Sequence, residues 1–298
     1  MNSGFIRLSL ENLLLNPTAC AELISSLRPH VIFICAAYTW VDGCELNKEK
    51  AFNINSYAPA RIAEEAQKVG AKVVYFSSDY IFDGTSGPYP ESYLPNPVNV
   101  YGISKYEGEK LVLEASPEAL IVRTTVVYGP EEQGKNFIYQ VVDSLQKGKE
   151  FICAKDQIGT PTYNRDLVCM TLGLVKAKAK GIYNCVGEEV FDRYSLACKC
   201  ASLLGYDANL IKGITTGEAV ERGKAQRGLK LGLVMEKTLK VLEKKHHPNS
   251  LQKNLDNWLN NQRGLFLHSG EKSQYNSNEQ LNTSYDISGL KDLRISHT

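Results

Sequence analysis

Short apolar runs alternate with longer amphipathic stretches along the first half of the chain. The runs are continuous and rich in β-branched residues, which is typical of strands buried on both faces of a sheet. They cover residues 31–37, 72–78 and 119–129. The stretches between and before them have helical spacing, and they cover residues 17–28, 49–69 and 101–115. Strands that alternate with helices predict an α/β fold, a doubly wound parallel sheet with helices on both faces.

The alternation loosens after about residue 150. Here the spacing predicts helices around a short strand at 181–187, which indicates a smaller mixed α/β lobe. The helices are predicted at residues 165–177, 193–205, 235–247 and 250–262. The end of the chain is rich in Ser, Asn, Gln and Gly, with too few apolar residues to offset the entropy of ordering it. We therefore predict a first domain, a second lobe and a disordered tail, at residues 1–150, 151–265 and 266–298.

Composition and charge narrow the function classes. The 298 residues include 34 Lys and Arg against 33 Asp and Glu, and this net charge of +1 argues against a nucleic-acid partner. No apolar run reaches the roughly 18 residues of a membrane span, and the first residues lack a signal-peptide pattern. The eight cysteines form no CxxC pair and no zinc-ligand spacing. These features predict free thiols, no metal site, no membrane association and a cytoplasmic protein.

One group of residues suggests catalysis. Tyr101 and Lys105 stand four residues apart, so a helix places both side chains on one face. Because an ammonium favours a nearby phenolate, we expect Lys105 to lower the pKa of Tyr101 from about 10, which makes Tyr101 a better proton donor. Ser78 ends a buried strand, and doubly wound sheets bind ligands at the carboxyl ends of their strands. A Tyr-x-x-x-Lys spacing also occurs on solvated helix faces, but this context favours a catalytic role.

Several segments, in this order, resemble the extended short-chain dehydrogenase/reductases, and within them the dTDP-4-dehydrorhamnose reductase family. They are RPHVIFICAAYTWVDGCE (28–45), AFNINSYAPARIAEEA (51–66), YFSSDYIFDG (75–84), PVNVYGISKYEGEK (97–110), IVRTTVVYG (121–129), DQIGTPTY (156–163) and GIYNCVG (181–187). The resemblance implies a Rossmann-like domain, a substrate-binding lobe, and NADP(H) or NAD(H) as the cofactor.

The resemblance also implies roles for single residues. Tyr101 matches the family's proton donor, Lys105 the lysine that holds the nicotinamide ribose, and Ser78 the hydroxyl residue of the triad. The implied cofactor-binding residues are Ala36, Ala37, Thr39, Tyr101 and Lys105. The implied substrate-binding residues are Ser78, Asp79, Asn136 and Gln157. Asn55 matches an asparagine near the active site. For Ala36, Ala37, Asn55 and Gln157, a purely structural role is an equal alternative.

The chain departs from the family at the cofactor site. The family opens with a strand, a G-x-x-G-x-x-G loop and a helix, and together they bind the pyrophosphate of the cofactor. No such glycine motif occurs in this sequence. We therefore expect an N-terminally truncated relative that lacks the first strand and whose cofactor binding is weakened or lost. Val126 and the pair Arg227-Gly228 also differ from the Trp and Arg-Pro common in the family, which leaves the sugar nucleotide open.

Two functions fit the resemblance, and the sequence leaves both open. The first is an NADP(H)-dependent reductase of a 4-keto-6-deoxy sugar nucleotide, in which Tyr101 donates the proton. The second is the regulatory β subunit of methionine adenosyltransferase, a family member that binds the catalytic subunit of S-adenosylmethionine synthesis. An inactive truncated form and a homodimer also stay open.

Overall fold

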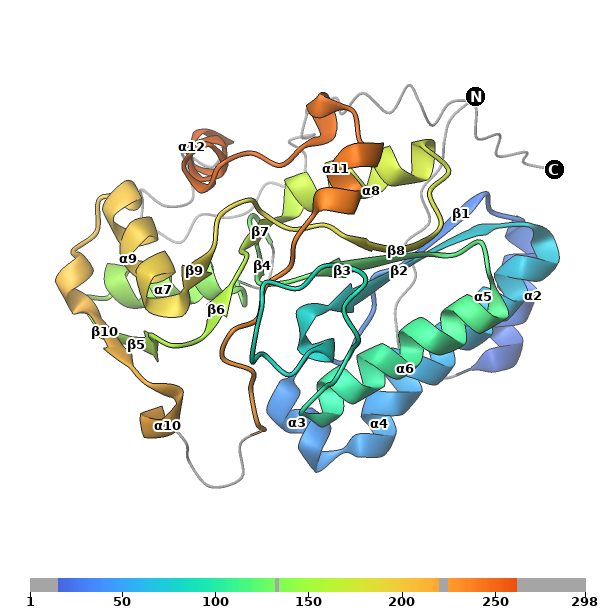
Figure 1. Ribbon diagram of the computed structural model, residues 1–298, viewed down its shortest axis with the longest axis horizontal. Helices are drawn as coiled ribbons and strands as arrows, with labels where there is room; N and C mark the ends of the chain where they lie inside the picture. The colour runs from blue at the N-terminus through green and yellow to red at the C-terminus, as the bar shows by residue number, and fades with distance from the viewer. Residues whose placement is uncertain (1–15, 132–133, 220–224, 262–298) are drawn as a thin grey trace, which may run out of the picture.

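A parallel sheet forms the centre of the computed structural model, which describes residues 16–131, 134–219 and 225–261. Its strands are hydrogen-bonded in the order β1-β2-β3-β8, all parallel (Figure 1). They are β1 (Val31–Ile34), β2 (Lys72–Ser78), β3 (Leu120–Thr124) and β8 (Gly181–Asn184). The register sets Ser78 opposite Thr124, so the carboxyl ends of β2 and β3 lie side by side. The predicted α/β fold with a parallel sheet is confirmed.

Helices cover both faces of this sheet (Figure 1). On one face lie α2 (Pro17–Leu27), α5 (Ala58–Val69) and α6 (Val100–Ala115). On the other lie α8 (Asn164–Lys176) and α11 (Glu236–Val241). Val112 of α6 is buried in one apolar cluster with Ile121, and Met170 of α8 is buried in another with Val122. Because Ile121 and Val122 are neighbours in β3, their side chains point to opposite faces, and each face needs its own helical layer.

The second half of the chain adds a smaller lobe at one end of the sheet (Figure 1). Its paired strands are β4 (Val127–Tyr128) with β7 (Thr162–Tyr163), β5 (Phe151–Ala154) with β10 (Ile211–Ile214), and β6 (Ile158–Gly159) with β9 (Phe191–Asp192). Its longer helices are α7 (Phe137–Gln146), α9 (Arg193–Leu204) and α12 (Leu251–Asn261). The boundaries predicted at 1–150 and 151–265 stay predictions. The topology adds that β8, from beyond residue 150, belongs to the main sheet.

Short helical turns complete the described chain. They are α3 (Val41–Leu46), α4 (Lys48–Phe52), η1 (Asn53–Tyr57), η2 (Asp79–Ile81), η3 (Ala208–Leu210), α10 (Thr216–Ala219) and η4 (Lys244–His246). None of the helices in the described ranges has both the length and the apolar composition needed to cross a bilayer. The tail predicted at 266–298 lies outside the described residues.

The π-helical turn η1 interrupts the helix predicted over residues 49–69. Pro59 has no N–H, and in regular α geometry its ring would meet the carbonyl of Asn55, four residues earlier. The wider π-helical turn avoids this clash. The Asn55 carbonyl accepts a hydrogen bond from the buried hydroxyl of Tyr75 at 2.7 Å. The widened turn therefore ties the helix to β2.

Two predicted elements are shorter than expected. The apolar run 119–129 is not one strand, because Val126 adopts left-handed backbone (φ 45°) that separates β3 from β4. The helix predicted over 235–247 ends at Val241, because Leu242 takes extended backbone and is buried in the apolar layer beside α8. In both cases a tertiary contact overrides a local pattern that continues past the break.

A buried ion pair joins α6 to β3. Arg123 donates from Nε and Nη2 to the two carboxylate oxygens of Glu109 at 2.9 and 2.7 Å, and both side chains are 2% exposed. At the preceding residue, Gly108, α6 approaches the carbonyl of Asn55 and the hydroxyl of Tyr75 so closely that any side chain would overlap them. Since both contacts depend on the same placement, they fix the position of α6 on the sheet.

Glu109→Gln leaves Arg123 with an uncompensated buried charge, so we expect the free energy of unfolding to fall by about 3 to 5 kcal/mol. The matched control is Glu107→Gln on the same helix, whose partner Lys110 is exposed. There we expect a loss below about 1 kcal/mol. Urea unfolding followed by circular dichroism measures both, and equal losses would contradict the role given to the buried pair.

Candidate active site

The amino end of α6 carries the two residues of the Tyr-x-x-x-Lys spacing. Asn99 caps this helix, because its side-chain oxygen accepts the N–H of Gly102 at 2.8 Å. Tyr101 and Lys105 follow in the first two turns, and they are 9% and 2% exposed. Both side chains therefore lie inside the protein and not on a solvated helix face.

Ser78, the last residue of β2, meets Tyr101. The Ser78 hydroxyl lies near enough to Tyr101 to lower its pKa, and Ser78 Oγ donates to Asp79 Oδ1 and accepts the N–H of Tyr80, each at 3.2 Å. The ring of Tyr80 stands edge-on to that of Tyr101, with 5.5 Å between centroids. The strand end and the helix start thus bring together two hydroxyls, an arrangement that can polarise a carbonyl oxygen.

Lys105 does not act on Tyr101 as the sequence suggests. Its Nζ donates to the carbonyl of Phe76 at 2.6 Å and lies 4.0 Å from the centre of the Tyr75 ring. Burial lowers the pKa of Lys105 to about 7. The pKa of Tyr101 is raised, because burial outweighs the opposing effect of the strand-end serine. The expectation that the ammonium lowers the pKa of Tyr101 is therefore wrong for this arrangement.

Asp79 lies buried next to this pair and is 2% exposed. Burial raises its pKa, and a hydrogen bond with Thr125, the charge of Arg193 and the N–H of Gly232 (3.4 Å) oppose the rise. Gly232 lies in the segment that follows β10, so Asp79 stands where the carboxyl end of β2 meets that segment. Its contact with substrate stays a prediction.

Asn55 holds the loop that follows β1. Its Oδ1 accepts the N–H of Tyr38 at 2.8 Å, and its Nδ2 donates to the carbonyl of Tyr38 at 3.1 Å and to Ser104 Oγ at 3.0 Å. The structural alternative for Asn55 therefore describes what the side chain does. The same loop contains the implied cofactor residues Ala36, Ala37 and Thr39, so Asn55 sets the position of that loop relative to α6.

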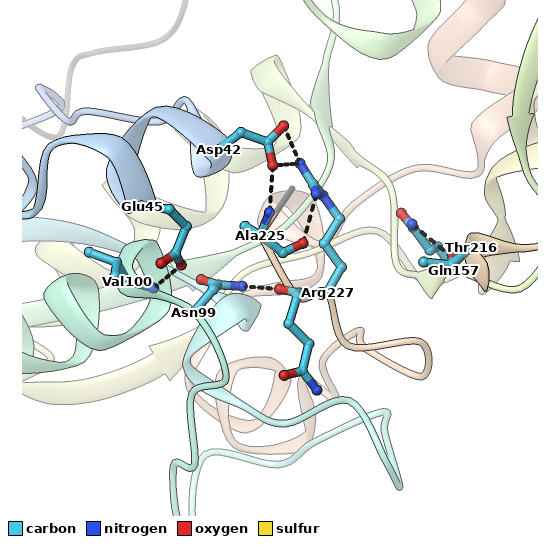
Figure 2. Close-up of polar contacts among 9 residues, drawn as sticks. Asp42, Glu45, Asn99, Val100, Gln157, Thr216, Ala225 and Arg227 are labelled. Carbon is cyan, nitrogen blue, oxygen red and sulfur yellow. Dashed lines mark hydrogen bonds and ion pairs between the residues drawn. The ribbon is translucent and has the colours of Figure 1, made fainter. Parts of the chain in front are cut away.

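Asn136 and Gln157 make structural contacts in the smaller lobe. Asn136 caps α7, since its Oδ1 accepts the N–H of Tyr139 at 3.2 Å, and its Nδ2 donates to the carbonyl of Gly129 at 2.9 Å. Gln157 Nε2 donates to the hydroxyl of Thr216 at 3.0 Å (Figure 2). The structure does not bring either side chain into hydrogen-bond contact with Ser78 or Tyr101, and their contact with substrate stays a prediction.

Segment 225–227 is hydrogen-bonded to α3 and to Asn99, the N-cap residue of α6 (Figure 2). Asp42 accepts the N–H of Ala225 at 3.0 Å and a hydrogen bond from Nη2 of Arg227 at 3.1 Å. Asn99 Nδ2 donates to the carbonyl of Gln226 at 2.8 Å. Asn99 therefore caps the helix of Tyr101 and also holds this segment, so one side chain couples their positions.

The structure explains Gly228, one of the two departures from the family, and gives no reason for the valine at 126. Gly228 lies against the backbone of Asp83 and Gly84, where any side chain would overlap the Asp83 carbonyl. Val126 adopts a left-handed backbone that a β-branched residue rarely takes. Its side chain lies where a side chain at residue 159, a glycine, would come into tight contact with it. Both features shape backbone near the strand ends, and the identity of the sugar nucleotide stays open.

The nicotinamide end of the cofactor fits the residues present. Thr124 Oγ1 is buried without a hydrogen-bond partner in the described ranges, and Thr124 stands opposite Ser78 in the register. An unpaired buried hydroxyl costs free energy, so it suits a polar ligand group such as a carboxamide. Ala36, Ala37 and Thr39 follow the carboxyl end of β1 at the same sheet edge. The pyrophosphate has no glycine-rich loop in this sequence, and cofactor binding itself stays a prediction.

Sequence patterns do not single out three residues that lie near the site. Tyr80 and Thr124 stand inside the segments YFSSDYIFDG and IVRTTVVYG, so closer attention to those strand ends would have found them. Arg193 begins a helix of the smaller lobe and belongs to no motif. Only the tertiary structure brings its charge near Asp79.

Comparison with known proteins places the chain in a family. The family described as RmlD substrate binding domain matches residues 8–262. Methionine adenosyltransferase 2 subunit beta of Xenopus tropicalis is 36% identical over 209 residues, 68% of this chain and 63% of that protein. dTDP-4-dehydrorhamnose reductase of Aggregatibacter actinomycetemcomitans is 36% identical over 184 residues, 59% of this chain and 62% of that protein. The chain thus spans less than two thirds of the length of these relatives.

Two solved structures share the fold over most of their length. A dTDP-4-dehydrorhamnose reductase of Clostridium acetobutylicum has a TM-score of 0.78 at 29% identity, over 86% of this chain and 89% of that one. The reductase of Bacillus anthracis, solved in complex with NADP, has a TM-score of 0.78 at 30% identity, over 85% and 88%. The parallel sheet agrees with these findings, and the chain belongs to the RmlD substrate binding domain family.

Proposed function

We propose that this chain is an NADP(H)-dependent reductase of a 4-keto-6-deoxy sugar nucleotide of the dTDP-4-dehydrorhamnose type. The observation that carries the proposal is the contact between Ser78 and Tyr101 at the carboxyl end of β2, with the buried Lys105 one turn further along α6. The reductase of Bacillus anthracis in complex with NADP supports NADP(H) over NAD(H). We assign the sugar nucleotide to the lobe at 151–265, with Asp79, Asn136 and Gln157 on the substrate side.

In the proposed reaction, both hydroxyls bind the same carbonyl oxygen and Tyr101 alone gives up its proton. The carbonyl oxygen of the sugar accepts hydrogen bonds from Ser78 and Tyr101, which draw electron density from its carbon. The hydride for that carbon would come from a nicotinamide cofactor when one is bound. Tyr101 gives its hydroxyl proton to the oxygen, and the product is an alcohol. The raised pKa of Tyr101 keeps that proton in place at neutral pH.

Lys105 changes its charge near neutral pH, since burial lowers its pKa to about 7. Its carbonyl and ring contacts from Phe76 and Tyr75 keep the ammonium inside the protein. Lys105 therefore stays buried at a cost to the stability of the fold, and we assign it the nicotinamide ribose of a bound cofactor.

A second function is favoured by the relatives. Methionine adenosyltransferase 2 subunit beta of Bos taurus is 34% identical over 70% of this chain, and the Xenopus tropicalis protein matches 68%. We propose as the alternative that the chain is a regulatory β subunit whose partner is the catalytic subunit of a methionine adenosyltransferase. All eight cysteines are free thiols, which supports the cytoplasm for either function. The homodimer stays a prediction.

Tyr101→Phe removes the proton donor and keeps the ring against Tyr80. We expect kcat for NADPH-dependent reduction of dTDP-4-dehydrorhamnose to fall at least about 100-fold, with KM little changed. Tyr106→Phe, the same change on the same helix outside the hydroxyl pair, is the matched control and keeps full activity. NADPH absorbance measures both rates. Turnover by the Tyr101 variant at the wild-type rate would rule out this mechanism.

Lys105→Met removes a buried group whose pKa falls from 10.5 to about 7 on folding. Between these values the unfolded chain holds a proton that the folded chain has lost, so this group makes the free energy of unfolding rise with pH. From about pH 7 to about pH 9.5 we expect wild type to gain about 2 to 3 kcal/mol relative to the variant. Urea unfolding of both proteins measures the difference. A constant difference across this range would contradict the lowered pKa.

The regulatory alternative predicts a stable complex. When the purified chain is mixed with the catalytic subunit of a methionine adenosyltransferase, we expect both to elute together on size-exclusion chromatography. A chain with reductase activity alone elutes separately. Separate elution at tens of micromolar of each protein would remove the regulatory function and leave the reductase.

A further inference from the structure

Three segments of the chain meet at Arg193, the first residue of α9. Its backbone N–H donates to the carbonyl of Gln157 at 3.2 Å. Its guanidinium lies over the ring of Phe137, with 5.0 Å to the centroid. Its charge acts on Asp79 and Tyr80, the two residues that follow Ser78. Arg193 therefore stands between the smaller lobe and the carboxyl end of β2.

The guanidinium of Arg193 makes no ion-pair contact with the residues that the structure describes. Arg123 is paired with Glu109 and Arg227 with Asp42, each through ion-pair contacts of 3.0 Å or less. The contacts of Arg193 are the ring beneath it and the through-space attraction to a buried carboxyl. A half-buried cation that is held in place and lacks a partner is suited to an anionic ligand.

We propose that Arg193 binds the diphosphate of the nucleotide sugar. A guanidinium offers parallel N–H donors that match phosphate oxygens, and the ring of Phe137 fixes the plane of those donors. The deoxy sugar of such a nucleotide is uncharged, so the diphosphate carries the negative charge of the substrate. This inference rests on the proposed function, and it names the residue by which the smaller lobe recognises that class of substrate.

Packing on Phe137 alone explains this arginine less well. The N-terminal turn of a helix carries partial positive charge, so a cation there is unfavourable. Asp192 already caps α9, because its Oδ1 accepts the N–H of Ser195 at 2.8 Å. Capping of α9 therefore does not require Arg193. An anion bound beside the guanidinium would offset the positive charge of both the guanidinium and the helix end.

Calorimetric titration with dTDP, which cannot be reduced, tests the proposal without turnover. Arg193→Met keeps an unbranched stem against Phe137 and removes the charge, and we expect its Kd for dTDP to rise at least tenfold. Arg193→Lys, which keeps the charge without the planar fork, gives an intermediate value. Lys199→Met on the exposed side of α9 is the matched control and keeps the wild-type Kd within about twofold.

Thymidine, which carries no phosphate, separates recognition of the diphosphate from a general loss of the site. We expect wild type and the Arg193→Met variant to bind thymidine equally. Equal loss of thymidine and dTDP affinity, unchanged dTDP affinity in the variant, or no dTDP binding by wild type would each overturn the proposal. The proposed reductase function is tested by a different experiment, the turnover of the Tyr101→Phe variant. The failure of either proposal can therefore be told from the failure of the other.

Discussion

The packing of α6 onto the sheet is the constraint on which the rest of the site depends. Glu109 and Arg123 form a two-point ion pair in an environment where a single unpaired charge is costly. Gly108 lets the helix backbone approach η1 and Tyr75 without a side chain between them. Because both contacts lie in one turn of the helix, α6 has little freedom to slide or rotate. That placement carries Tyr101 to the end of β2.

The same packing buries Lys105, and burial has chemical consequences. An ammonium that is 2% exposed loses its hydration, so its pKa moves toward neutrality, while burial moves the pKa of Tyr101 the other way. Opposed shifts of neighbouring groups are characteristic of functional sites. The start of α6 also holds segment 225–227 through Asn99 (Figure 2). Helix α6 therefore positions both the reacting side chains and the backbone of segment 225–227.

Patterns along the chain predicted the parallel sheet, because apolar periodicity and helix spacing are local properties. The breaks were not predicted. Val126 lies inside an apolar run that continues as β-branched residues, and only the pairing of β4 with β7 explains its left-handed backbone. The direction of the Lys105 ammonium depends on Phe76 and Tyr75, and the place of Arg193 depends on three distant segments. The spacing of residues along the sequence cannot predict contacts of this kind, because they join segments that are far apart in the chain.

We propose that Ser78, Tyr101 and Lys105 form a reductase site that takes a nicotinamide cofactor. Titration of NADPH against the purified chain, followed by the fluorescence of the reduced nicotinamide, tests it most directly. We expect saturable binding, with a signal that changes as the ring enters the buried environment beside Thr124 and Tyr101. A chain that is folded by circular dichroism and shows no saturable binding up to about millimolar NADPH would contradict the reductase function.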